Sequence, residues 1–116
     1  MDGEQSLEVP TSAGVIRGFI HPRTGVRTWR GVPYGGPTGG ENRFRAPQMV
    51  TPWEGVRETT RFAPPALQGS FGWKDHVVGT EDCLTLDIVR PDTDEELPVV
   101  VYFHGCLLYT SDAADD

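Results

Sequence analysis

Residues 99–105 read Val-Val-Val-Tyr-Phe-His-Gly, and this stretch decides the fold class. Its five apolar residues do not alternate with polar ones, which predicts a strand covered on both faces by helices. His104 and Gly105 would then lie at the carboxyl end of the strand, where open α/β sheets place their chemistry. The stretch therefore predicts an α/β fold whose site begins at His104.

The preceding residues predict short antiparallel strands. Residues 7–9 and 15–20 flank a turn centred on Gly14, which indicates a hairpin. Residues 26–31 are expected to add a third strand to the same unit. Residues 84–89 alternate apolar and polar side chains, which predicts a strand covered on one face.

The rest of the chain reads as loops. It holds 14 glycines and 10 prolines, and the prolines break any regular element in residues 32–52. Residues 51–73 are expected to continue as a loop with one short helical turn, from which Trp53 and Phe62 anchor onto the core. Residues 90–97, Arg-Pro-Asp-Thr-Asp-Glu-Glu-Leu, predict a polar turn or hairpin loop.

Charge and cysteine content exclude several classes of protein. The net charge is -7, to which Asp112, Asp115 and Asp116 contribute. No basic patch indicates nucleic acid, and no apolar run is long enough to span a membrane. The opening Met-Asp-Gly-Glu-Gln-Ser is unlike a secretory signal, so we expect a cytoplasmic protein. In that compartment a disulfide between Cys83 and Cys106 is not expected.

No complete catalytic or metal-binding constellation is visible. Ser70 lies near glycines, but their spacing differs from the G-x-S-x-G pattern of a nucleophile. His76 follows Asp75, and adjacent side chains seldom point at each other, so it is interpreted as a solvated loop residue. His104 and Cys106 are two potential metal ligands, which is too few for a zinc site, since zinc needs three or four. We therefore expect neither a metal nor a cofactor.

Five stretches, taken in order, resemble the opening of the type-B carboxylesterase family, which includes cholinesterases and bacterial para-nitrobenzyl esterases. EDCLTLDIV is the most specific, and it departs from the usual E-D-C-L-Y-L-N-[IV] at Thr85 and Asp87, on the polar face, where both changes should be tolerated. The stretches are GVIRG (14–18), RGVPYGGPTGGENRFRAP (30–47), PWEGVRETT (52–60), EDCLTLDIV (81–89) and PVVVYFHG (98–105).

The resemblance implies an incomplete N-terminal part of an α/β-hydrolase fold, here mostly β-strands and loops. It implies that the parent protein is a serine carboxylic-ester hydrolase acting on a small-molecule ester, with all three triad residues beyond Gly105. His104 and Gly105 match the start of the family's H-G-G-G motif, whose later backbone N–H groups help to form the oxyanion hole. Cys106 stands in place of the next glycine. The chain itself is expected to be inactive, and the alternative is a non-catalytic cholinesterase-like binding or adhesion module.

Further implications of the resemblance concern single residues. Arg43 and Glu81 match positions that form a structural ion pair, so their side chains are expected to meet. Cys83 has no cysteine near residues 64–68 to pair with, which indicates a free thiol and favours a bacterial relative. The glycines of Tyr-Gly-Gly-Pro-Thr-Gly-Gly replace alanine and proline and are expected to loosen their loop.

The end of the chain breaks the motif. Codons TGT CTC TTA TAC ACA TCT GAC GCT GCC GAC would encode the residues from Cys106 onward, and this DNA resembles a transposase-type sequencing adapter read in frame. We therefore expect residues 1–105 to be the N-terminal fragment of a carboxylesterase domain and residues 106–116 to be an artefactual tail. A genuine polar tail is the alternative.

Overall fold

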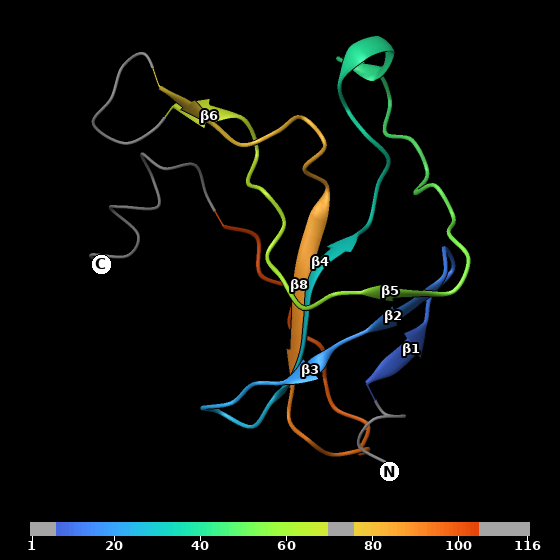
Figure 1. Cartoon of the computed structure of the whole chain (residues 1–116), viewed down its shortest axis with the longest axis vertical. Coiled ribbons are helices and arrows are strands. Elements are labelled where there is room, and N and C mark those ends of the chain that lie inside the picture. Colours follow the sequence, from blue (N-terminus) through green and yellow to red (C-terminus); the bar gives the residue numbers. More distant parts are fainter. Residues whose placement is uncertain (1–6, 70–75, 105–116) are drawn as a thin grey trace.

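The computed structural model describes residues 7–69 and 76–104. In these residues the chain forms two three-stranded sheets and one two-stranded pair (Figure 1). The elements are β1 (Glu8–Pro10), β2 (Val15–Arg17), β3 (Phe19–Ile20), β4 (Arg27–Pro33), the 3-10 helix η1 (Gly40–Asn42), β5 (Val56–Glu58), β6 (Gln68–Gly69), β7 (Val77–Val78) and β8 (Thr85–Arg90).

The first sheet has the strand order β1-β2-β5. β1 and β2 form the expected antiparallel hairpin, and the Thr11 hydroxyl closes its turn by donating to the Gly14 carbonyl oxygen at 2.6 Å. β5 pairs with β2 in parallel, with Val15 opposite Val56. Arg17 of β2 spans the sheet, since its guanidinium contacts Glu8 and Glu58, each at 2.7 Å.

The second sheet has the order β3-β4-β8 and is antiparallel throughout. The expected third strand exists as β4 and pairs antiparallel with residues 19–20, but the predicted strand 15–20 is divided into β2 and β3, which belong to different sheets. The extended segment breaks at Gly18, where a Cβ atom would meet the Thr28 carbonyl oxygen and would lie 2.8 Å from the Trp29 ring. The chain changes sheets at this glycine.

A small core lies between the two sheets. Its buried apolar side chains in the described residues are Ile16, Trp29 and Val32, and Trp53 packs against them as expected. Thr59 links the sheets: its backbone N–H and its hydroxyl both donate to the Arg17 carbonyl oxygen, and its own carbonyl oxygen accepts from the Arg30 N–H.

Phe62 is not a core anchor, contrary to the sequence-based expectation. Its side chain is 65% exposed, and its ring lies beneath the Arg30 guanidinium instead. The expected helical turn in residues 51–73 is also absent from the described part of that segment. The short helix η1 lies earlier, at Gly40–Asn42.

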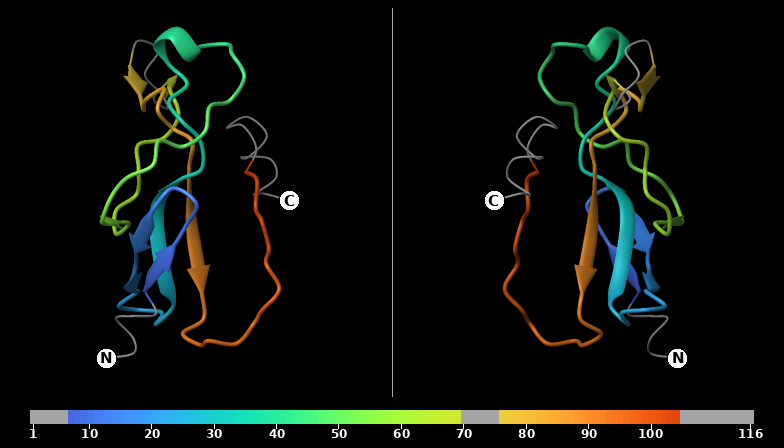
Figure 2. Two further views of the ribbon diagram at one scale, coloured as in Figure 1. Left: turned by 90° about the vertical axis from the view of Figure 1, so that its right-hand side faces the viewer. Right: turned by 90° about the vertical axis from the view of Figure 1, so that its left-hand side faces the viewer.

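Residues 99–103 do not form the expected buried strand. The structure assigns them no strand, and their side chains are 67–90% exposed. Figure 2 shows that the chain turns away after β8 and returns alongside it without joining the sheet. A strand needs hydrogen-bonded neighbours, and in the described structure residues 99–103 pair with no strand.

The polar loop that follows β8 was correctly predicted. Arg27 contacts Asp92 at 2.8 Å and Asp94 at 3.0 Å. Arg90 donates to the carbonyl oxygens of Thr93 and Glu95, each at 2.7 Å. Two arginines on neighbouring strands therefore hold this acidic loop in place.

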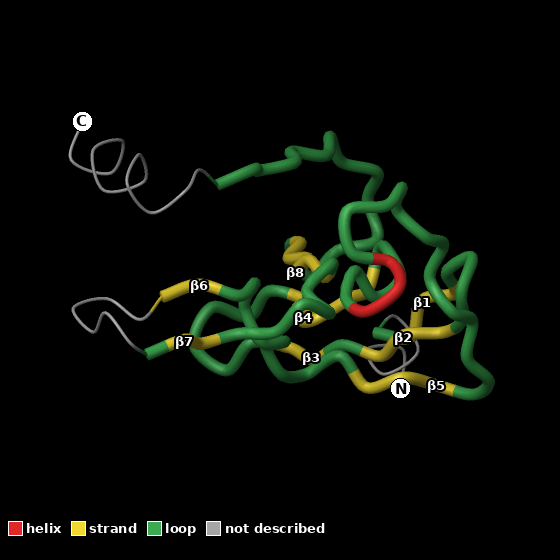
Figure 3. Tube along the Cα trace, turned by 90° about the horizontal axis from the view of Figure 1, so that it is seen from above, coloured by secondary structure: helices red, strands yellow, loops and turns green. Residues whose placement is uncertain are grey.

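Figure 3 places the strands of the first sheet and the β6–β7 pair on opposite sides of β4 and β8. The β6–β7 pair was not predicted, because each strand has only two residues in the described part of the chain. Beyond it, the Thr80 N–H donates to the Pro65 carbonyl oxygen at 2.9 Å. These contacts bring residues 62–69 close to the start of β8.

Candidate functional site

His104 lies on the wall of a cavity of about 480 Å³ beside the start of β8. The loop that precedes β6 and the residues that lead into β8 form most of the wall, and Tyr34 adds an aromatic ring. The lining residues are Tyr34, Phe62, Ala63, Pro64, Pro65, Ala66, Gln68, Cys83, Leu84, Thr85, Asp87 and His104. Gly105 and Cys106, the other residues of the predicted site motif, lie outside the described residues.

The wall of this cavity is mixed, with apolar side chains from the loop before β6 and polar ones such as Gln68, Asp87 and His104. Such a lining suits a small organic molecule that has both apolar and hydrogen-bonding parts. Cys83 is a free cysteine in the described chain and contributes to the wall. No serine lines the cavity in the described residues, so the site lacks a serine nucleophile there.

Arg43 and Glu81 clamp the irregular loop to the entry of β8. Arg43 Nε donates to Glu81 Oε1 and Arg43 Nη2 donates to Glu81 Oε2, both at 2.8 Å. The two parallel bonds hold the planar guanidinium in one orientation. The Thr38 hydroxyl donates to the Glu81 carbonyl oxygen and adds a third tie. Because Cys83 and Leu84 follow directly, this clamp positions one wall of the cavity.

The clamp shifts the ionisation of both partners. Hydrogen bonding to Arg43 holds the pKa of the Glu81 carboxyl below its ordinary value of 4.5, and a backbone N–H from Gly40 acts in the same direction. The carboxylate in turn raises the pKa of Arg43. The contact thus favours the charged form of each group.

The glycines after Tyr34 pack tightly, contrary to the expectation that they loosen the loop. Gly35 and Gly36 are both buried. A Cβ atom on Gly35 would lie 2.6 Å from a methyl group of Leu84, and one on Gly36 would lie 2.9 Å from the Met49 carbonyl oxygen. Glycine is needed here because the backbone approaches its neighbours too closely for a side chain.

We expect Glu81→Gln to remove part of the acid sensitivity of the fold. A carboxylate whose folded pKa is lowered stabilises the structure above its unfolded pKa, and this stability is lost as the pH falls through the folded value. The midpoint temperature of thermal unfolding of the unchanged chain should therefore decrease as the pH is lowered from neutral to about 3. At neutral pH the variant should have a lower midpoint temperature than the unchanged chain. On acidification its midpoint temperature should decrease less.

Tryptophan fluorescence during heating provides the measurement. Glu41→Gln is the matched control, because Glu41 is exposed and forms no ion pair in the described structure. If the Glu81 and Glu41 variants gave superimposable midpoints across the pH range, the clamp would have no role in stability.

The other residues considered from the sequence do not add to the site. His76 is exposed, as expected of a loop histidine. Ser70 and Asp75 lie outside the described residues. Among residues 7–69 and 76–104, no three His, Cys, Asp or Glu side chains gather as metal ligands. No helix in the same part of the chain is long and apolar enough to cross a membrane.

Comparison with known proteins decides the family. The family model described as "Carboxylesterase family" matches residues 5–115. This chain belongs to the carboxylesterase family. The resemblance of the five stretches is thereby confirmed.

Individual carboxylesterases cover the chain but extend far beyond it. Para-nitrobenzyl esterase of Bacillus subtilis (strain 168) is 34% identical over 106 residues, which are 87% of this chain and 21% of that protein. Acetylcholinesterase of Bungarus fasciatus is 32% identical over 123 residues, which cover 95% of this chain and 20% of that protein. This chain therefore spans about a fifth of the length of these carboxylesterases.

Solved carboxylesterases share the fold. A thermophilic PNB esterase superposes with a TM-score of 0.75 at 35% identity, covering 86% of this chain and 21% of its own. A carboxylesterase of Geobacillus stearothermophilus superposes with a TM-score of 0.64 at 38% identity, covering 76% of this chain and 17% of its own. The chain is an incomplete part of the α/β-hydrolase fold of these carboxylesterases, and it consists mostly of strands and loops.

Proposed function

We propose that this chain is the N-terminal part of a serine carboxylic-ester hydrolase, the parent protein. The observation that carries the proposal is the cavity beside His104, which lies in a carboxylesterase-family chain at the residue where the family's H-G motif begins. Its wall of apolar and polar side chains suits the ester of a small molecule. No cofactor is needed for this reaction.

In the proposed mechanism, a serine attacks the ester carbonyl while a histidine, oriented by an acidic residue, takes its proton. Water then releases the acyl group. These three residues belong to the part of the parent beyond Gly105. The described residues supply one wall of the cavity, through Tyr34 and Leu84, and the His104 end of the oxyanion motif.

The 116-residue chain is expected to have no esterase activity, because no serine of the described residues lines the cavity beside His104. The measurement is the hydrolysis of a nitrophenyl ester by the purified chain against a blank purified from cells without the gene. A rate above that blank, abolished by heating, would overturn the prediction.

The parent protein provides the positive test. We propose that residues 106–116 are translated adapter, so adapter-free sequencing of the source DNA should reveal further glycines and an open frame after Gly105. The protein from that frame should hydrolyse the nitrophenyl ester. It should lose the activity when the serine of its G-x-S-x-G pattern is replaced by alanine. Persistence of Cys-Leu-Leu-Tyr-Thr-Ser in the source DNA would favour the non-catalytic binding module.

A cytoplasmic and bacterial origin is also part of the proposal. It is supported by Cys83, which has no disulfide partner in the described residues. Relatives of the chain come from bacteria, snakes, insects and mammals, so the source DNA is the test of this point.

A further inference from the structure

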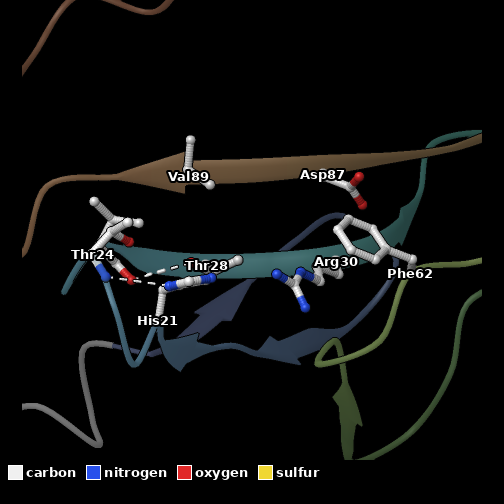
Figure 4. Close-up of a pocket in the computed structure, with 8 residues that line it drawn as sticks. His21, Thr24, Thr28, Arg30, Phe62, Asp87 and Val89 are labelled. Atoms are coloured by element: carbon white, nitrogen blue, oxygen red, sulfur yellow. Dashed lines mark hydrogen bonds between the residues drawn. The ribbon is translucent and has the colours of Figure 1, made fainter.

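A second cavity, of about 330 Å³, lies on one face of the β3-β4-β8 sheet (Figure 4). It is distinct from the cavity beside His104, although Phe62 and Asp87 line both. Its walls come from the turn between β3 and β4, from β4 itself and from β8. The lining residues are His21, Thr24, Val26, Thr28, Arg30, Phe62, Asp87 and Val89.

Arg30 is held in this cavity by aromatic rings rather than by carboxylates. Its guanidinium carbon lies 4.1 Å from the centre of the Phe62 ring and 5.0 Å from that of Phe19. Rings hold the flat faces of a guanidinium and leave its N–H edge free to donate. In the described residues this edge has no ion-pair or hydrogen-bond partner.

Arg30 differs in this respect from three other arginines of the described structure. Arg17, Arg27 and Arg43 each contact one or two carboxylates within 3.0 Å. Arg30 is half-buried and faces the cavity, and it makes no ion pair with a carboxylate in the described structure. A positive charge in such a position attracts an anion.

His21 supplies a second donor on the same wall. Its Nδ1 accepts the backbone N–H groups of Arg23 at 3.2 Å and Thr24 at 3.3 Å. A ring nitrogen that accepts hydrogen bonds carries no proton, so in the neutral ring the proton is on Nε2. Nε2 has no hydrogen-bond partner among the described residues. In Figure 4 the His21 ring and the Arg30 guanidinium lie along the same side of β4.

We propose that this cavity binds a small carboxylate that carries an apolar ring or chain. The carboxylate would accept from the Arg30 guanidinium, and the apolar part would pack against Phe62, Val26 and Val89. The His21 Nε2–H would be a further donor along the same wall. Carboxylates of this class are also what ester hydrolysis releases. The binding site itself does not depend on the proposed activity, because no catalytic residue takes part in it.

Asp87 gives the proposal a second, opposite prediction. Its Oδ1 accepts the Gly31 N–H at 2.9 Å, and its negative charge faces the same cavity. Asn in its place keeps an oxygen that can accept this hydrogen bond and removes the repulsion of an anion. Asp87→Asn should therefore strengthen binding, whereas Arg30→Gln should weaken it.

Saturation-transfer NMR on the 116-residue chain, with benzoate as the ligand and benzamide as its neutral analogue, tests the site. Benzoate should give a saturable signal that benzamide does not give. Arg30→Gln should weaken benzoate binding at least about tenfold, because a charge-assisted contact is lost. Asp87→Asn should strengthen it about twofold to threefold.

Arg57→Gln is the matched control, since Arg57 also lies over an aromatic ring, 5.1 Å from that of Trp53, but does not line the cavity. It should bind benzoate like the unchanged chain. Circular dichroism of each variant shows whether the sheets are retained, and Arg30→Lys serves as a milder variant if Arg30→Gln does not fold. Absence of benzoate binding, equal binding of benzamide, or equal losses in the Arg30 and Arg57 variants would overturn the proposal.

Discussion

Trp29→Ala should lower the free energy of unfolding by about 3–5 kcal/mol and disrupt the first sheet and the core between the sheets. Trp29 is only 3% exposed, and it is the largest of the three buried apolar side chains in the described core. Its ring fills the space that Gly18 leaves open, and its Nε1–H donates to the Leu7 carbonyl oxygen at 3.0 Å. No neighbouring side chain can take over both roles.

Amide hydrogen exchange measures this effect locally, strand by strand. Protection of the amides in β1, β2 and β4 should disappear in Trp29→Ala. The amide protection in Trp29→Phe should lie between that of the unchanged chain and that of Trp29→Ala. Phe keeps most of the ring but loses the hydrogen bond to Leu7, which is worth about 1 kcal/mol. Val89→Ala is the control at an exposed position. Retained protection in Trp29→Ala would show that the core does not depend on this ring.

Residues 99–103 should make the chain associate with itself, and two charges placed there should largely prevent it. The segment is apolar, β-branched at three positions and exposed over its whole length. β8 is an edge strand of its sheet in the described structure, so it offers unpaired backbone groups to another chain. We expect poor solubility of the unchanged chain, and a several-fold larger soluble fraction for Val99→Glu with Val101→Glu.

Size-exclusion chromatography with light scattering, together with the soluble fraction after expression, tests this expectation. The pair Thr51→Glu and Thr60→Glu adds the same charge at exposed loop positions and controls for the general effect of charge on solubility. A soluble monomer of the unchanged chain, at the concentration used for the variants, would contradict the prediction. Equal rescue by the control pair would assign the effect to net charge alone.

The parts of the fold that could be predicted from the sequence are those determined by neighbouring residues. The β1–β2 hairpin follows from the turn at Gly14, and β8 follows from its alternating pattern, although its apolar residues Leu86 and Ile88 are exposed and not covered as predicted. β5 was missed because Val56–Glu58 is exposed and has no periodicity, and its partner β2 lies far away in the sequence. Residues 99–103 were predicted as a strand from their apolar side chains, but a strand also needs hydrogen-bonded neighbours.

The candidate site was only partly visible in the sequence. The apolar run of residues 99–103 pointed to His104, and family resemblance pointed to Arg43 with Glu81, which no periodic pattern selects. Tyr34 and Leu84 were not identified as cavity walls, because both occupy ordinary apolar positions in the sequence. The stacking of Phe62 on Arg30 depends on two segments meeting in space, and the sequence alone suggested a core anchor instead.

The bonds of Thr59 also set an order of events during synthesis of the chain. Thr59 is 1% exposed and joins Arg17 to Arg30, so this link between the two sheets cannot form until residue 59 has left the ribosome. The β1–β2 and β3–β4 hairpins are each formed from near neighbours and need no later residue. Because domains begin to fold from the N-terminus during translation, a pause just before this threonine would leave the two hairpins without this backbone link.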